Sequence, residues 1–151
     1  MSRPPSIILF ERLYLGSIAL YILNAALFWT QNRALVAAMP QLRANAQLAS
    51  LVGAIIVGSL VVTLLLSLLF WWLVAKQRSE AGKWAVVVTE VIGALLAVLP
   101  LIRLVQGATP NVVGAVLGLA STALAIWAAT LLFRPDAQPW FGEQDAAEPL
   151  A

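Results

Sequence analysis

Two charged side chains, Arg12 within the first expected long helix and Glu90 within the third, are the residues of this sequence best placed to do chemistry. A charge in the hydrocarbon of a bilayer costs at least about 2.5 kcal/mol, so it is normally paired or functional. Arg12 comes about six residues after the expected start of the first long helix, and Glu90 about seven after the start of the third. Helical rise then places both charges roughly 10 Å from the same membrane face. We predict a buried ion pair between Arg12 and Glu90.

Glu90 also fits a second interpretation, in which a protonatable carboxylate lies in the path of a transporter or channel. Such paths usually contain a second acid, an asparagine–aspartate cluster or paired broken helices, and none of these accompanies Glu90 in the sequence. The ion pair is therefore the favoured prediction. Arg103, close to Pro100 at the opposite end of the same segment, is expected to extend toward lipid phosphate.

The sequence offers no other set of reactive groups. It has no cysteine and no histidine, which excludes disulfide exchange, thiolate metal sites and the commonest general base, metal ligand and haem ligand. A net charge of +2 is too small to indicate nucleic-acid binding. We therefore predict a protein that is not an enzyme, with no catalytic residues, cofactors or metal ligands. The alternative, an enzyme acting on lipid, would need a nucleophile with a base.

Four apolar segments must position these residues, at 13–30, 48–75, 84–102 and 112–133. Each carries at most one formal charge and reaches the roughly 18 to 20 residues that a helix needs to cross a bilayer core. The prediction is an all-α membrane protein, a four-transmembrane-helix antiparallel bundle that forms a single domain over residues 1–141. A short acidic flexible tail is expected at 142–151.

Local signals place the ends of the first two long helices. Ser6 is expected to cap the first helix, which should run to about Trp29. Pro40 divides the connection at 31–47, and a helical turn is expected on either side of it. The second long helix should cover 48–75.

The second half of the chain carries similar signals. A short basic connection at 76–83 predicts a hairpin with the third helix, which should kink at Pro100. Thr109 is expected to cap the fourth helix, with Pro110 at its first position. Residues 134–141 should fold back on the membrane surface, because an apolar aromatic pair ends this segment.

Basic residues are divided unevenly between the two sides of such a bundle. Six lie on the side of the termini and the second connection: Arg3, Arg12, Lys76, Arg78, Lys83 and Arg134. Three lie on the other side: Arg33, Arg43 and Arg103. Because lysine and arginine are enriched on the cytoplasmic side, this predicts that both termini are cytoplasmic.

One face of the first helix combines aromatic and polar side chains, and these side chains repeat at spacings of four and three: Phe10, Tyr14, Ser17, Tyr21, Asn24 and Phe28. The hydroxyl and amide groups would leave polar atoms in hydrocarbon, so this face should be buried in the bundle or against another protein. Packing is the favoured interpretation, and a polar lining for a ligand is the alternative.

Small residues recur every four positions on the last two helices. Gly114, Gly118 and Thr122 form one such groove, and Gly93 with its neighbours Thr89 and Ala97 forms another. Flat grooves let two backbones approach closely, and this packing stabilises helix association in lipid. We expect the two grooves to face each other. A similar pair, Ala54 and Gly58, marks the second helix.

The opening FERLYLGSIAL, residues 10–20, and the closing LLFRPDAQPWF, residues 131–141, resemble segments of a known group of proteins. The group consists of uncharacterised small bacterial four-helix inner-membrane proteins with an ERLY-type start and an LFRPDAxxWF-type end. The resemblance covers the whole chain and implies a bacterial cytoplasmic (inner) membrane, with no activity to carry over.

The predicted function is that of a non-enzymatic accessory or scaffold subunit of a bacterial inner-membrane complex. Its expected partners are membrane lipids and other membrane proteins or further copies of itself, with no nucleic acid. The alternative is a small oligomeric transporter or channel with Glu90 in the path, and a hydrophilic cavity that reaches Glu90 would favour it.

Overall fold

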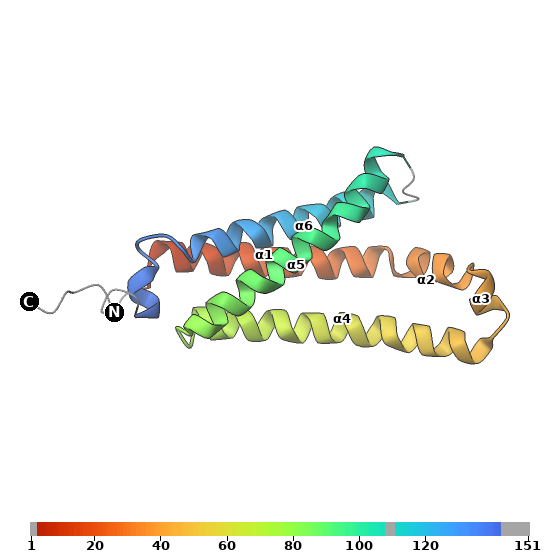
Figure 1. Ribbon diagram of the computed structural model, residues 1–151, viewed down its shortest axis with the longest axis horizontal. Coiled ribbons are helices and arrows are strands. Elements are labelled where there is room, and N and C mark those ends of the chain that lie inside the picture. The colour runs from red at the N-terminus through yellow and green to blue at the C-terminus, as the bar shows by residue number, and fades with distance from the viewer. Residues whose placement is uncertain (1–2, 108–110, 143–151) are drawn as a thin grey trace, which may run out of the picture.

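The protein is an antiparallel bundle of four long helices, seen in a computed structural model that describes residues 3–107 and 111–142. The helices are α1 (Pro5–Leu27), α4 (Ala46–Ala75), α5 (Glu80–Val105) and α6 (Val112–Leu131). Arg3, the α4–α5 turn and residues 132–142 lie at one end, here called the terminal end (Figure 1). The opposite end, which holds α2 (Trp29–Ala37) and α3 (Pro40–Arg43), is called the far end.

Each of the four long helices is long and apolar enough to cross a membrane. Their outward faces expose large aliphatic side chains, with Leu51, Leu65 and Leu95 each more than half exposed. Such surfaces suit lipid and not water. The predicted fold class, a four-span all-α bundle, is confirmed.

Three of the long helices begin at a polar capping residue. The Asn45 Oδ1 accepts hydrogen bonds from Gln47 N and Leu48 N at the start of α4, each 3.0 Å long. Ser79 caps α5, and its Oγ accepts from an amide at 3.1 Å. Asn111 caps α6 in the same way at 2.8 Å. The predicted cap, Thr109, falls outside the described residues, and α6 begins after Asn111, whose amide oxygen accepts from the Gly114 N–H.

The first turn of α1 is hydrogen-bonded to a residue that follows α6, Asp136. Ser6 lies inside the helix and does not cap it, contrary to the prediction. The Asp136 carboxylate accepts from Ser6 N at 3.0 Å and from Ser6 Oγ at 2.7 Å. A carboxylate at a helix N-terminus is favourable because the first amides of a helix lack internal acceptors.

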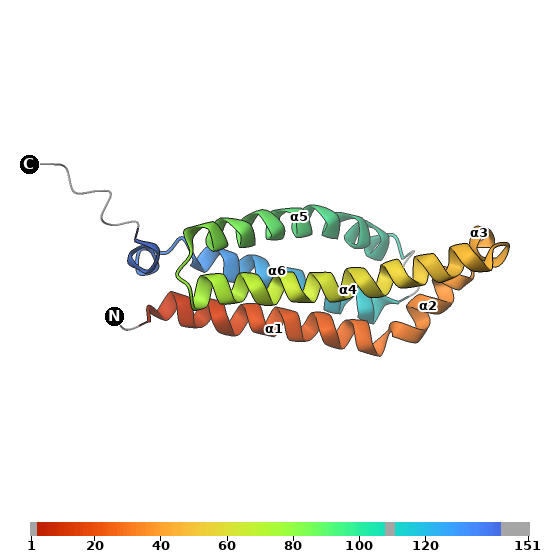
Figure 2. The ribbon, with the colours of Figure 1, turned by 90° about the horizontal axis from the view of Figure 1, so that it is seen from below.

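The connection between α1 and α4 holds more helix than predicted. α1 ends at Leu27, and α2 continues from Trp29 to Ala37 before α3 starts at Pro40, so helix does lie on both sides of that proline. Further along, α5 runs without interruption through Pro100. Figure 2 shows α5 bowed, which fits the loss of one backbone hydrogen bond at a proline.

α6 packs lengthwise on α1, and small residues let the two helices approach (Figures 1 and 2). Ser121 Oγ donates to the carbonyl oxygen of Ser17 at 2.8 Å. A β-carbon built on Gly118 would meet Asn24 Nδ2 of α1 at 3.6 Å, whereas one on Gly93 would meet only Glu90 of its own helix. The structure therefore does not place Gly93 against Gly118, because the small-residue face of α6 is turned toward α1.

The apolar core lies at the terminal end. Residues from α1, α4, α5, α6 and the segment after α6 build it, with Phe10, Tyr14 and Val74 among the most deeply buried. The short 3-10 helix Gln138–Phe141 packs Trp140 onto this core, whereas the sequence predicted that residues 134–141 would fold back on the membrane surface. The predicted tail at 142–151 lies outside the described residues after Gly142.

Candidate functional site: a polar cavity at Glu90

Arg12 and Glu90 are not joined in the structure. The ion pairs in the described part of the chain link Glu11 to Arg3 at 3.1 Å and to Lys76 at 3.3 Å. Arg12 is exposed, because two residues along a helix turn it about 200° away from the buried Phe10 face. Glu90 is half-buried on α5, about 15 Å along the axis from Glu80, and so lies within the span.

Glu90 lines a cavity of about 370 Å³ between the four long helices. Polar side chains from every one of them reach it. They are Tyr14, Ser17 and Tyr21 of α1, Thr63 and Ser67 of α4, Thr89 and Glu90 of α5, and Ser121 and Thr122 of α6. Among the described residues no basic side chain lines this space. A polar cavity at membrane depth with one carboxylate is a potential binding site.

Several lining hydroxyls already use their proton on the backbone. Ser17 Oγ donates to the Tyr14 carbonyl at 2.7 Å, Ser121 Oγ to the Ser17 carbonyl at 2.8 Å, and Thr122 Oγ1 to the Gly118 carbonyl at 3.1 Å. A hydroxyl in this state offers only lone pairs to its surroundings. The cavity wall is therefore rich in acceptors, which favours a cation or a hydrogen-bond donor over an anion.

The two tyrosines connect α1 to the α4 side of the cavity. The Tyr14 hydroxyl approaches Ser67 and is close enough to Glu90 for an electrostatic interaction with it, and the Tyr21 hydroxyl approaches Thr63. Both tyrosine side chains line the cavity. Phe10 stacks on Tyr14 with ring centroids 5.2 Å apart, which fixes the position of that ring.

Glu90 also borders a second space, on the other side of α5. An apolar groove of about 430 Å³ lies between α5 and α6 and is lined by Val87, Glu90, Val91, Ala94, Ile126, Ala129, Thr130 and Phe133. Val91 and Phe133 are 55% and 44% exposed, so the groove opens on the face that meets lipid. Glu90 is the one side chain that the groove and the polar cavity share.

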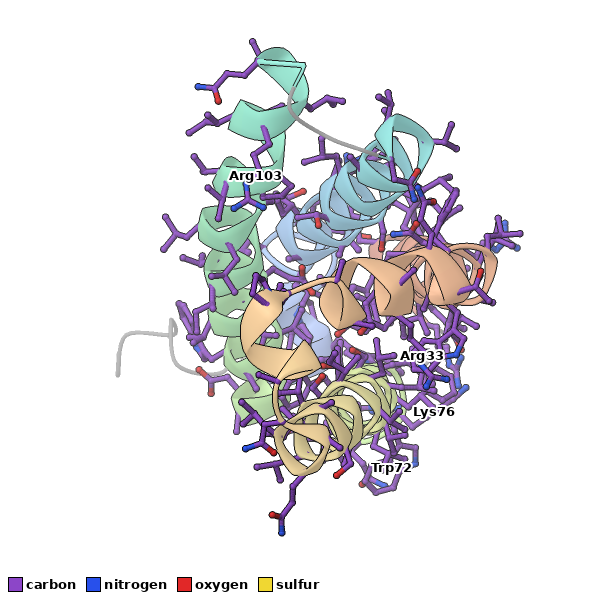
Figure 3. The ribbon with its side chains drawn as sticks, turned by 90° about the vertical axis from the view of Figure 1, so that its right-hand side faces the viewer. Arg33, Trp72, Lys76 and Arg103 are labelled. Atoms are coloured by element: carbon purple, nitrogen blue, oxygen red, sulfur yellow. The ribbon has the colours of Figure 1, made fainter. Side chains whose placement is uncertain are left out.

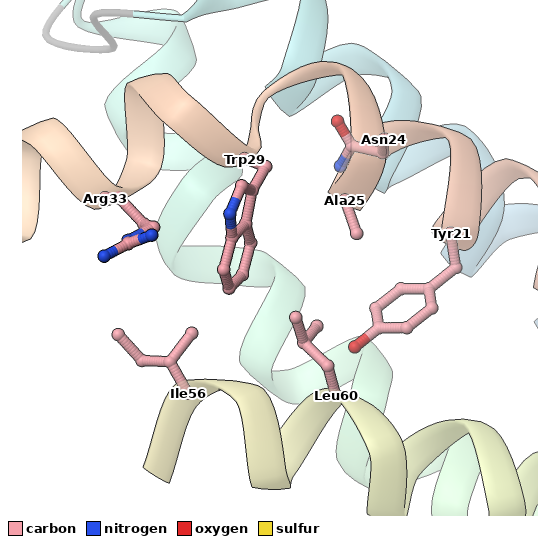
Figure 4. Close-up of a pocket in the computed structure, with 7 residues that line it drawn as sticks. All are labelled: Tyr21, Asn24, Ala25, Trp29, Arg33, Ile56 and Leu60. Carbon is pink, nitrogen blue, oxygen red and sulfur yellow. The ribbon is translucent and has the colours of Figure 1, made fainter. Parts of the chain in front are cut away.

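A third space lies between α1, α2 and α4 toward the far end (Figure 4). Its volume is about 240 Å³, and Asn24, Trp29 and Arg33 contribute its polar lining together with Tyr21. Tyr21 borders this space and the polar cavity alike.

Arg103, on α5, lies away from Arg33 when the bundle is seen from its far end (Figure 3). Its exposed position agrees with the expectation that it reaches lipid headgroups.

The predicted stripe on α1 serves both packing and lining. Phe10 and Tyr14 belong to the core, Ser17 is buried against α6, Tyr21 and Asn24 border cavities, and Phe28 is half-buried where α1 ends. Of the predicted small residues, Gly93 and Thr122 line the polar cavity, Gly118 faces α1, and Gly114 lies against its own capping residue Asn111.

Sequence reasoning missed the α4 side of the cavity. Thr63 and Ser67 follow Ser59 at spacings of four, and this polar row within an otherwise apolar helix could have indicated a shared face. Thr89 was predicted only as part of a packing groove and Ser121 was not singled out, since single hydroxyls are common in membrane helices and can bond to their own backbone.

The fold and this site define a multi-pass helical membrane protein with a polar cavity between its spans. Comparison with models of known families, with curated proteins and with solved structures gives no match to the chain.

Proposed function

We propose that this protein is a small membrane transporter or channel that binds a cation at Glu90. The observation that carries the proposal is the polar cavity, which hydroxyl groups from four helices line together with a single carboxylate and, among the described residues, no basic side chain. A carboxylate in a medium of low dielectric attracts a cation far more strongly than one in water does. The protein would then be non-enzymatic, and binding would be its chemistry.

Antiparallel packing supports the location that the sequence predicts. The structure gathers the described termini and the 76–83 connection at one end, together with Arg3, Lys76, Arg78, Lys83 and Arg134. We propose that this end faces the cytoplasm of a bacterium, in its inner membrane, because basic residues accumulate on that side.

The proposal is tested by the charge preference of a thiol placed in the cavity. The chain has no cysteine, so Ser67→Cys would carry the only thiol. In proteoliposomes the ratio of its labelling rates with a positively and a negatively charged methanethiosulfonate reagent should exceed the ratio of a simple free thiol by at least about tenfold, a preference of ~1.4 kcal/mol that a nearby carboxylate can supply. Adding Glu90→Gln should abolish the preference while labelling continues.

Ser59→Cys is the matched control, because Ser59 is exposed on the same helix and does not line the cavity. It should resist both reagents in hydrocarbon. A rate ratio at Ser67→Cys no larger than that of the free thiol, or no labelling there at all, would show that the cavity is not a hydrated cation site and would refute the proposal.

An accessory or scaffold role is the second candidate, and an open surface on α4 favours it. A β-carbon added at Gly53 or Gly58 would meet no atom within 4 Å, so the small-residue face that includes Ala54 is free for another helix. Gly58→Cys should form a disulfide-linked dimer on oxidation if the partner is a second copy. If it does not, and purification from the native host in mild detergent yields this chain alone, the scaffold role fails.

A further inference from the structure

We infer that the ligand of Glu90 is a lipophilic monovalent cation that enters from the bilayer through the groove between α5 and α6. The inference rests on the proposed function and adds the class of ligand and its route. It starts from one geometric fact, namely that Glu90 borders an apolar groove open to lipid on one side and a polar cavity on the other.

The groove walls select for apolar surface. Residues one turn apart on α5, among them Val87, Val91 and Ala94, face Ile126 and Ala129 of α6. The one hydroxyl in the lining, that of Thr130, donates to the Trp127 carbonyl at 2.7 Å and so is already used. A small inorganic cation would have to leave its water behind to pass here, and burying an unpaired charge in such surroundings is strongly unfavourable. Apolar substituents around a cationic centre remove that obstacle.

Glu90 supplies the charge that a cation needs at the inner end of the groove. Its carboxylate lies toward Gly93, the next turn along α5, since a β-carbon on Gly93 would lie 3.9 Å from Glu90 Oε2, and Gly93 lines the polar cavity and not the groove. A cation that follows the groove inward therefore meets the carboxylate where the acceptor-rich wall begins. No basic residue among the described ones lines either space.

The sizes of the two spaces agree with an organic ligand. The groove and the cavity measure about 430 and 370 Å³, and pockets of ~300–1,000 Å³ hold drug-sized molecules. A neutral amphiphile or a lipid acyl chain could fill the groove, but it would leave Glu90 without a counter-charge. Charge complementarity thus favours an onium or ammonium ion with apolar substituents over these occupants.

The test measures binding of tetraphenylphosphonium to the full-length protein in detergent by equilibrium dialysis. Three probes separate the contributions: tetraphenylphosphonium itself, tetramethylammonium with the same charge and little apolar surface, and neutral triphenylphosphine oxide. We expect the first to bind at least about tenfold more tightly than either of the others, and Glu90→Gln to remove this advantage, a change of ~1.4 kcal/mol.

Val91→Phe should fill the groove and weaken tetraphenylphosphonium binding by a similar factor. Ile92→Phe is its matched control, because Ile92 is 53% exposed on the same turn of α5 and does not line the groove. Ile126→Phe, at a residue of α6 that is 37% exposed, fills the groove from the other wall and provides a second variant if Val91→Phe fails to fold.

The outcomes separate this inference from the proposed function. Binding that depends on Glu90 but is untouched by Val91→Phe and Ile126→Phe would refute the lipid route. Absence of tetraphenylphosphonium binding, or equal binding of the neutral probe, would refute the lipophilic cation. In either case a persistent charge preference at Ser67→Cys would leave the cation site itself standing. Loss of that preference would refute the proposed function as well.

Discussion

Replacing Trp140 by phenylalanine should destabilise the protein by about 1–3 kcal/mol, because a buried carbonyl then loses its hydrogen-bond donor. Trp140 Nε1 donates to the carbonyl oxygen of Val74 at 3.0 Å, and the Val74 side chain is 0% exposed. The last carbonyls of a helix have no donor within the helix. At the end of α4 the Trp72 carbonyl accepts from Lys76 N and the Leu73 carbonyl from Ser79 N. The next carbonyl along the helix is that of Val74, and the indole N–H of Trp140 is its donor.

Truncation of Trp140 to alanine should have a larger effect, about 3–5 kcal/mol, because it also leaves a cavity against the core. It removes the ring on which the Arg78 guanidinium lies, 4.2 Å from the ring centroid, and such contacts contribute about 0.5–1 kcal/mol at exposed sites. The expected order of stability is therefore wild type, then Trp140→Phe, then Trp140→Ala.

Reversible unfolding in one mixed-micelle system would measure these differences. Trp127→Phe is the control, since Trp127 is 54% exposed on α6 and should change stability by less than about 0.5 kcal/mol. If Trp140→Phe is as stable as wild type, the indole N–H is not needed at the end of α4. If Trp140→Ala is also neutral, residues 134–141 do not hold the terminal end together.

Three further predictions concern the same end of the bundle and its helices. Hydrogen bonds from Ser6 lower the pKa of Asp136 in the folded protein below the usual aspartate value of about 3.9, so they stabilise the fold above that pH, and this stability is lost as the pH falls through the lower folded-state pKa. Ser6→Ala should therefore destabilise the protein at pH 7 and have little effect at strongly acidic pH, which melting curves at several pH values would measure. Gly82→Ala should destabilise by about 1–3 kcal/mol, because its β-carbon would lie 2.7 Å from a β-carbon of α4, whereas Gly58→Ala, which meets nothing within 4 Å, should be neutral or stabilising in the same unfolding assay. A cysteine at the exposed Gln77 should be protected from an impermeant reagent added outside intact cells, and rapid labelling would reverse the proposed orientation.

The sequence by itself determined the number of spans and their approximate limits. Segments with 18 or more apolar residues must lie in lipid whatever their neighbours are, because no soluble arrangement could bury them all. The end of α4 at Ala75 and the return of residues 134–141 followed from equally local signals, a polar basic turn and an apolar aromatic pair in a polar tail. The lone carboxylate of Glu90 was visible for the same reason, since it is the only charge inside its segment.

The tertiary structure alone decided what Glu90 meets. Depth along a helix follows from counting residues, but the direction of a side chain depends on how each helix is rotated in the bundle, and one residue changes that direction by about 100°. Arg12 shares the expected depth yet points outward, while Ser67 and Ser121, from helices distant in the sequence, turn inward. The small-residue face of α6 met α1 and not α5 for the same reason. Rotation is set by the packing of all four helices together, and in lipid-facing helices the apolar pattern is too uniform to reveal it.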